Sequence, residues 1–293
     1  MPLDPRQSQI DFVLISSRQH IREAEEDLKE YGDTGKITPM QVDLSSFDST
    51  DKVAHELAAT LTRLDALVLN AGLGVGPYAA SEDGIDTHFQ VNVVSQHHLM
   101  MLLLPTLTKT ESSRVVFQSS EFHRLGTGDV RFADMGEINR DVGPANLYNR
   151  TKLAQILLMS CLVRAKRQSK FGLSPGRPPY FICTHPGGVS TDQPKQAEEA
   201  YGTKGSIGVK MVRPFMKDPV KQGCRPALFA ATSPEVVEGQ GLDGKYIVPD
   251  RKVTDTSKNS KDEGLQDACL RLVEGCLVGK FGMERLGYPT LLA

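Results

Sequence analysis

Short apolar segments alternate with longer polar ones along this 293-residue chain. Apolar runs bounded by polar residues predict buried strands at residues 10–17, 36–42, 64–69, 114–118, 180–184 and 244–248. Helices are predicted between them at 19–31, 49–63, 86–104, around 147–161, and at 227–231 and 263–278. Strands that alternate with helices in this way are typical of a parallel sheet with helices on both faces. The sequence therefore predicts one α/β domain over residues 1–293, with a Rossmann-like doubly wound sheet.

Composition excludes several other classes of protein. The formal net charge is -2 and the pI is near 6.4, so nothing indicates a nucleic-acid partner. The five scattered cysteines form no Cys-x-x-Cys pair, which fits reduced thiols inside a cell. The longest apolar run, Leu99–Leu104, is too short to span a bilayer, and the first residues lack signal-peptide character. We therefore expect a cytoplasmic protein without a transmembrane segment, while attachment to a membrane surface stays open.

Tyr148 and Lys152 form the strongest catalytic candidate. They lie four residues apart on a predicted helix, a spacing that places both side chains on one face. The ammonium would favour the phenolate and lower the tyrosine pKa from its usual value of about 10. Such a tyrosine can pass a proton to or from a carbonyl or alcohol oxygen. Taken alone, the motif is better interpreted as a surface pair, so its significance depends on the residues at the strand ends.

Ligands of open parallel sheets bind beyond the carboxyl ends of the strands. Several distinctive residues stand at those ends, namely Arg18, Asp43, Asn70-Ala71-Gly72, Ser120 and Pro186-Gly187. With Tyr148 and Lys152, this set resembles the short-chain dehydrogenase/reductase family over about residues 10–250, and most closely its retinol-dehydrogenase-like and fungal ketosteroid-reductase-like members. The resemblance implies an NADP(H)-dependent oxidoreductase. Its substrate would be a lipophilic ketone, aldehyde or secondary alcohol from lipid, sterol or secondary metabolism.

The resemblance also assigns catalytic roles. Tyr148 would be the general acid/base, and Lys152 would hold the nicotinamide ribose and lower the pKa of Tyr148. Ser120 would hydrogen-bond the substrate oxygen, with Ser119 as the rival hydroxyl. Asn92 would support a water chain to the lysine, and its structural alternative is an amide that kinks or caps the helix.

The cofactor contacts follow from the same resemblance. They are Asp43 and Leu44 beside the adenine, the turn Asn70, Ala71 and Gly72, then Pro186, Gly187, Val189 and Thr191 beside the carboxamide and pyrophosphate, with Tyr148 and Lys152. Arg18 distinguishes between cofactors, because an arginine after the family's second strand accommodates the 2′-phosphate of NADP(H). Its alternative is a solvent-exposed arginine.

Other features complete the expectations. No Gly-x-Ser-x-Gly elbow indicates a serine hydrolase, and the histidines have no partner at metal-ligand spacing, so no metal is expected. Residues 190–220 would form a substrate lid, and 251–293 a C-terminal extension. The resemblance also implies a homodimer that pairs through the helices containing Asn92 and Tyr148.

The family's first strand, Gly-rich turn and helix are not recognisable. The strand predicted at 10–17 already matches the family's second, and residues 1–9 contain no Thr-Gly-x-x-x-Gly-x-Gly turn. The segment Gly72–Gly76 is no substitute, because it opens no immediate helix. The absent strand would lie centrally, between 10–17 and 64–69, where unpaired backbone groups are costly.

Three explanations of this difference stay open. The sequence could be incomplete at its start. The protein could be a shortened, non-catalytic member of the family that acts as a binding or regulatory module. Alternatively, residues 1–9 and the flanking strands could repack and retain weak activity.

Overall fold

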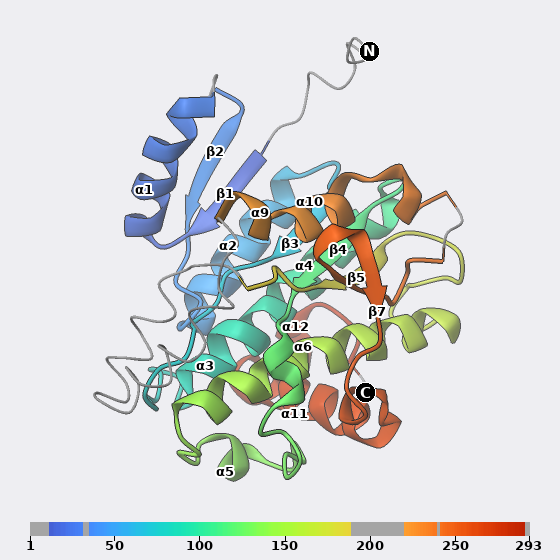
Figure 1. The fold of residues 1–293 in the computed structure, drawn as a ribbon. Coiled ribbons are helices and arrows are strands. Elements are labelled where there is room, and N and C mark those ends of the chain that lie inside the picture. Colours follow the sequence, from blue (N-terminus) through green and yellow to red (C-terminus); the bar gives the residue numbers. More distant parts are fainter. Residues whose placement is uncertain (1–11, 32–34, 189–219, 239–240, 291–293) are drawn as a thin grey trace.

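The computed structural model describes residues 12–31, 35–188, 220–238 and 241–290. Strands and helices alternate through most of these ranges (Figure 1). The strands are β1 (Phe12–Ser16), β2 (Ile37–Gln41), β3 (Ala66–Leu69), β4 (Arg114–Gln118), β5 (Tyr180–Thr184), β6 (Tyr246–Val248) and β7 (Lys252–Thr254). The helices before β5 are α1 (Arg18–Leu28), α2 (Phe47–Thr60), α3 (Thr87–Phe89), α4 (Ser95–Lys109), α5 (Met135–Ile138) and α6 (Pro144–Arg167). Those after it are α9 (Val220–Gly223), α10 (Arg225–Thr232), α11 (Glu263–Phe281) and α12 (Met283–Leu286).

Nearly all strand pairs are parallel. Strand β1 pairs with β2, and a second sheet has the order β3-β4-β5-β6-β7. The pair β6–β7 is antiparallel, and β7 is an additional strand that follows the set predicted from the sequence, which ends at 244–248. Its turn residues Asp250 and Arg251 have positive φ angles, which reverse the chain within three residues. The predicted parallel α/β architecture is confirmed.

The sheet is interrupted between β1 and β3. Within the described residues, β1 forms a ladder with β2 alone and β3 with β4 alone, so their facing edges carry no inter-strand pairing. In Figure 1, β1, β2 and α1 accordingly stand as a unit beside the larger sheet. The interruption falls between the two strands that would flank the family's absent central strand.

Helices cover the larger sheet on two faces. Helix α10 packs over β4 and β5 on one side, and α6 packs against the same strands on the other, with α11 beyond it (Figure 1). Val116 on β4 is fully buried under α10, whereas its neighbour in register, Val68 on β3, is 42% exposed. Helix α10 also contacts β3, but it leaves Val68 exposed next to the interruption in the sheet.

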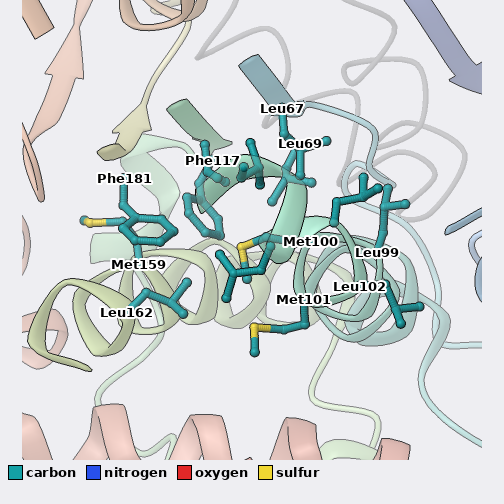
Figure 2. Close-up of a cluster of buried hydrophobic side chains, with 14 of the residues drawn as sticks. Leu67, Leu69, Leu99, Met100, Met101, Leu102, Phe117, Met159, Leu162 and Phe181 are labelled. Atoms are coloured by element: carbon teal, nitrogen blue, oxygen red, sulfur yellow. The ribbon is translucent and has the colours of Figure 1, made fainter. Parts of the chain in front are cut away.

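The main core lies between the sheet and helices α2, α4 and α6. Side chains from alternate positions of β3, β4 and β5 point into it, because successive residues of a strand face opposite ways. Figure 2 shows them meeting α4 and α6; the labelled residues are Leu67, Leu69, Leu99, Met100, Met101, Leu102, Phe117, Met159, Leu162 and Phe181. Packing in this core sets the position of α6 relative to the carboxyl ends of β4 and β5.

Two predicted helix boundaries differ from the structure. Helix α2 begins at Phe47, two residues before the predicted start at 49, with Ser46 as its N-cap. The Ser49 hydroxyl accepts a hydrogen bond from the Asp43 amide instead of capping the helix. The helix predicted at 86–104 contains a π-helical turn at Gln90–Val94, and α4 then continues past Pro105 to Lys109. The fully buried Leu107 explains the extension, since its packing outweighs the one hydrogen bond that a proline cannot donate.

The C-terminal segment covers the helical face that the dimer prediction would use. Helix α11 packs along α6 and against the π-helical turn that contains Asn92. Tyr288 hydrogen-bonds His98 of α4 at 2.9 Å, and the same imidazole contacts Asp51 of α2 at 2.9 Å. Pairing of two copies stays a prediction, and α11 restricts the surface that such a partner could reach.

Candidate active site

Helix α6 carries both Tyr148 and Lys152 into the interior. It begins at Pro144, a residue suited to the first turn, directly after Gly143, whose φ of 84° favours glycine. The residues Tyr148 and Lys152 are 3% and 5% exposed, so the pair is not the solvated surface pair that the motif alone favours. The Lys152 ammonium lies 5.4 Å from the centre of the Tyr148 ring, within cation–π range.

Main-chain and amide oxygens hold the Lys152 ammonium. Its Nζ donates to the Gln118 carbonyl oxygen at the end of β4 (2.8 Å) and to Oε1 of Gln155 (3.3 Å). Burial lowers the pKa of Lys152 to about 8, because a charged amine loses its hydration there. The thiol of Cys183, which faces the ammonium, has its pKa raised to about 12 by burial and is therefore neutral near pH 7. The described surroundings of Lys152 thus contain no carboxylate counter-ion that would offset this effect of burial.

The two serines after β4 have different surroundings. The Ser119 hydroxyl donates to the main-chain oxygen of Lys152 at 2.8 Å, which ties the strand end to α6. The Ser120 hydroxyl accepts a longer hydrogen bond, 3.3 Å, from the Phe122 amide and so begins the 3-10 turn Glu121–Arg124. Phe122 packs edge-on against the Tyr148 ring, with centroids 5.9 Å apart. Ser120 therefore lies at the start of the turn that contacts Tyr148, and its hydroxyl proton is not committed to a described partner.

The Asn92 side chain clamps the Asn70-Ala71-Gly72 turn. Its Oδ1 accepts from the Leu73 amide (2.7 Å), and its Nδ2 donates to the Leu73 carbonyl and to Thr151 Oγ1 (both 3.0 Å). A Cβ on Gly72 would approach Asn92 Oδ1 to 2.9 Å, so only glycine permits this contact. The π-helical turn places the Asn92 main-chain oxygen beside Gln155, whose Nε2 donates to it at 3.0 Å. The side chain of Asn92 thus has a structural role, while its main-chain carbonyl faces Gln155 and, beyond it, Lys152.

The predicted cofactor residues lie in different parts of the fold. Asp43 accepts hydrogen bonds from Ser45 after β2, and the Leu44 carbonyl accepts from Ser95 of α4 at 2.7 Å. Arg18 is the first residue of α1, directly after the end of β1. Pro186 and Gly187 follow β5, with Gly187 at a φ of 89°. Val189, Thr191 and nearly all of the predicted lid at 190–220 lie outside the described residues.

Sequence reasoning missed two buried amides and an ion pair. Gln155 and Gln96 extend the hydrogen-bond network from Lys152. Their spacing could have indicated this, because Gln155 follows Lys152 by three residues and Gln96 follows Asn92 by four, which places each pair on one helix face. The side chains of Asp86 and Arg150 are 0% and 3% exposed and pair at 3.0 Å. No sequence signal indicated this pair, because its members are 64 residues apart.

Other sites receive little support from the structure. A cavity of about 490 Å³ lies between α11 and the segment before α5, and its lining, which includes Met135, Arg271 and Cys276, contains none of the catalytic candidates. Across the described ranges, no group of three or more His, Cys, Asp or Glu side chains could hold a metal ion. In the same ranges, no helix combines the length and apolar character needed to cross a bilayer.

The fold and the buried pair together define a class of protein. A parallel α/β sheet with a Tyr–Lys pair on the helix beside its strand ends is the architecture of a Rossmann-type oxidoreductase. A family model described as short chain dehydrogenase matches residues 7–128. The chain belongs to the short-chain dehydrogenase/reductase family, whose members use nicotinamide cofactors.

Individual relatives support this assignment. The mitochondrial oxidoreductase bli-4 of Neurospora crassa is 36% identical over 66% of this chain and 48% of its own length. Human retinol dehydrogenase 14 is 30% identical over 78% of this chain and 64% of its own length. The chain thus spans about half to two thirds of the length of these curated relatives.

Solved structures show the same fold. An uncharacterized protein from Mycobacterium paratuberculosis superposes with a TM-score of 0.64 over 91% of this chain and 92% of its own, at 23% identity. A short-chain dehydrogenase/reductase from Burkholderia phymatum, in complex with NAD, gives a TM-score of 0.55 over 81% of this chain and 79% of its own, at 15% identity.

Proposed function

We propose that this protein is an NADP(H)-dependent oxidoreductase that transfers hydride between nicotinamide and a lipophilic ketone, aldehyde or secondary alcohol. The observation that carries the proposal is the buried Tyr148–Lys152 pair beside the Ser120 turn. A buried lysine held only by neutral oxygens is costly to maintain, and its charge has an evident use next to a phenol.

The chain's own groups supply the proton chemistry in this proposal. In the direction of reduction, Tyr148 donates its phenolic proton to the carbonyl oxygen, and the Lys152 ammonium stabilises the resulting phenolate. The Ser120 hydroxyl donates a hydrogen bond to the same substrate oxygen and stabilises the charge that develops there. The bound nicotinamide supplies the hydride. Oxidation of an alcohol uses the same groups with the proton moving in reverse.

The described residues fit one end of the cofactor better than the other. Two of the three Lys152 N–H donors are engaged, by Gln118 and Gln155, which leaves one to donate to a ribose hydroxyl. No Gly-rich turn that could receive the pyrophosphate opens a helix within the described residues, and the sheet is interrupted where such a turn would start. We therefore propose that the reactive end of the cofactor lies at Lys152, and we assign no described residue to its pyrophosphate.

This interruption favours a second candidate function, a non-catalytic member of the family that acts as a binding or regulatory module. Fluorescence titration of the 293-residue chain with NADPH, with NADH as the control, separates the two proposals. We expect saturable binding that prefers NADPH. A folded chain that binds neither dinucleotide would refute the oxidoreductase proposal and support the binding module.

Arg18 provides a test of cofactor choice. Replacing Arg18 with alanine is expected to weaken NADPH binding about 10- to 100-fold and leave NADH binding unchanged, because a hydrogen-bonded charge pair with a phosphate contributes about 1.5–3 kcal/mol. Arg22→Ala on the same helix is the matched control, since Arg22 is exposed and lies one turn further along. Equal losses for NADPH and NADH, or no loss in Arg18→Ala, would contradict the role of Arg18 in recognising the 2′-phosphate.

The two serines should separate catalysis from stability. Ser120→Ala is expected to lower kcat about 100-fold, because it removes a donor to the substrate oxygen. Its stability cost should be about 0.5–1 kcal/mol, because only the long hydrogen bond from the Phe122 amide is lost. Ser119→Ala is expected to cost about 1–3 kcal/mol of stability, because the buried Lys152 carbonyl loses its donor. Steady-state kinetics and urea unfolding on both variants check this pair of outcomes. If Ser119→Ala showed the larger loss in kcat, the assignments would have to be exchanged.

Substrate class and location are also proposals. The lipophilic substrate is supported by the similarity to retinol dehydrogenase 14. A screen of retinal and steroid ketones with NADPH tests the substrate class, and activity confined to small polar aldehydes would refute it.

The proposed location is the cytoplasm, or the surface of a membrane. Cell fractionation checks this location. Recovery in a mitochondrial fraction, which is the compartment that the name of bli-4 gives, would overturn it.

A further inference from the structure

Four buried polar residues form a continuous network behind Tyr148. Lys152, Gln155, Gln96 and Asn92 are 5%, 1%, 4% and 0% exposed, respectively. Hydrogen bonds join them in series, from the Lys152 ammonium through Gln155 to the Asn92 main-chain oxygen and to Gln96 Oε1. Gln96 Nε2 in turn donates to the Ala71 carbonyl in the turn after β3.

We propose that Gln155 is a positioning residue that holds the Lys152 ammonium through its side-chain carbonyl, while its side-chain NH₂ is anchored on the Asn92 main-chain oxygen. The proposal concerns a residue to which the motif assigns no role. Its consequence for turnover rests on the proposed function, whereas its effect on Lys152 itself does not.

The surrounding acceptors fix the orientation of the Gln155 amide. Its Nε2 lies 3.0 Å from the Asn92 main-chain oxygen and 3.4 Å from Gln96 Oε1, which are both acceptors. An amide has two N–H donors, and these two acceptors use both of them. The carbonyl end must therefore face Lys152, which is itself only a donor when protonated. The opposite orientation would place acceptor against acceptor and donor against donor.

This arrangement makes Lys152 a fixed donor. Gln118 and Gln155 accept two of its hydrogen bonds from different sides, which restricts where the third can point. The resemblance implies a water chain between Asn92 and the lysine, but here the Gln155 side chain itself bridges the two. A water molecule can pass a proton along, whereas an amide does not release one near neutral pH. The bridge therefore stabilises the ammonium form without offering it a proton exit through Asn92.

Among the described residues, few titratable groups lie near Lys152, so the influence of Gln155 on its pKa can be measured. Tyr148 on α6 and Cys183 on β5 face the ammonium, and burial keeps the Cys183 thiol neutral. The other described contacts, the Gln118 carbonyl of β4 and Gln155, carry no charge. A change at Gln155 should therefore appear directly in the titration of Lys152.

Two substitutions of opposite sign test the proposal. Gln155→Met keeps the length of the side chain but removes the acceptor, and it is expected to lower the pKa of Lys152 by about one unit. Gln155→Glu places a carboxylate at the same point and is expected to raise that pKa by about one unit or more. The measurement is an NMR titration of protein with isotope-labelled lysine, in which Lys152→Met assigns the signal.

The control removes a buried glutamine from another region. Gln266 of α11 is 6% exposed and donates to the Ser260 carbonyl, so Gln266→Met should leave the Lys152 titration unchanged. Shifts of opposite sign in the two Gln155 variants would support a direct hold on the ammonium, because a general loosening of the core moves both the same way. Shifts of the same sign, or none, would overturn the proposal.

Turnover distinguishes this proposal from the proposed function. If the protein reduces carbonyls, Gln155→Met should lower kcat about 10-fold and shift the pH profile with the Lys152 titration, while the KM of the carbonyl substrate stays unchanged. A wild-type chain that neither binds NADPH nor turns over would refute the oxidoreductase proposal only. The Lys152 titration would still decide the role of Gln155.

Discussion

Replacing Tyr148 with phenylalanine is expected to lower turnover by about 10²- to 10⁴-fold, the usual contribution of a positioned general acid/base. The substitution removes only the hydroxyl. The ring would keep its edge-on contact with Phe122 and its position near the Lys152 ammonium. Stability and NADPH binding should therefore change little, so that the loss falls on kcat. Steady-state kinetics combined with NADPH titration and urea unfolding measure these three quantities.

The structure offers a matched control for this experiment. Tyr180 on β5 also has a lysine over its ring, with Lys166 Nζ 4.6 Å from the centroid, but it stands at the start of the strand. Ligands of a parallel sheet bind at the opposite, carboxyl end. Tyr180→Phe should therefore retain wild-type turnover. Full activity in Tyr148→Phe, or equal losses in the two variants, would refute the assignment of Tyr148 as the acid/base.

Removing the carboxylate of Asp86 is expected to cost about 3–5 kcal/mol of unfolding free energy, the cost of leaving a buried charge unpaired. The Arg150 guanidinium contacts Asp86 at 3.0 Å and also donates to the Ile138 and Glu137 carbonyls. Asp86 in addition caps α3 by accepting from the Phe89 amide at 3.1 Å. Asp86→Ala would leave the guanidinium buried with neutral oxygens alone. Urea unfolding measures the loss.

A double variant and an exposed pair serve as controls. Asp86→Ala combined with Arg150→Met removes both charges and should recover most of the lost stability, because replacing a whole buried ion pair is often nearly neutral. The pair Arg63–Asp65 has a shorter contact of 2.7 Å, yet its side chains are 70% and 56% exposed. Asp65→Ala should therefore cost less than about 1 kcal/mol. A loss this small in Asp86→Ala would contradict the energetic importance of the buried pair.

The Asp86–Arg150 pair also bears on the site. Arg150 lies between Tyr148 and Lys152 on α6, and Asp86 begins the segment that continues into the π-helical turn with Asn92. The ion pair thus joins the two segments that carry the catalytic candidates. Loss of activity in Asp86→Ala with recovery in the double variant would be consistent with this link.

Local pattern was sufficient to predict most of the elements. The strands Arg114–Gln118 and Tyr180–Thr184 match their predicted bounds, because each is a short apolar run between polar residues. The predicted end of the 86–104 helix was less accurate, since Pro105 suggests a stop that the packing of Leu107 overrides. The antiparallel β7 was missed because three residues, mostly exposed, carry no apolar pattern.

The candidate site was predictable only for residues whose position in the fold follows from their spacing in the sequence. Residues four apart, such as Tyr148 and Lys152, lie on one face of any helix, and residues at the carboxyl ends of parallel strands lie at one edge of the sheet. The preference for Ser120 over Ser119 came from the resemblance, and the structure adds a physical reason, since Ser119 is bonded to the Lys152 carbonyl. The role of the Asn92 side chain was not predictable, because its partners, Leu73 and Thr151, are 19 and 59 residues away.

The sequence by itself determined the α/β class, the positions of most strands and the Tyr148–Lys152 pair, because these depend on periodicity and spacing within a few turns of chain. Only the tertiary structure decided how the pair is held. Lys152 hydrogen-bonds the Gln118 carbonyl, which is 34 residues away in the sequence, and Gln155 hydrogen-bonds Asn92, which is 63 residues away. Such hydrogen bonds form between segments that packing brings together, and their donors and acceptors are common polar groups without a distinctive local pattern.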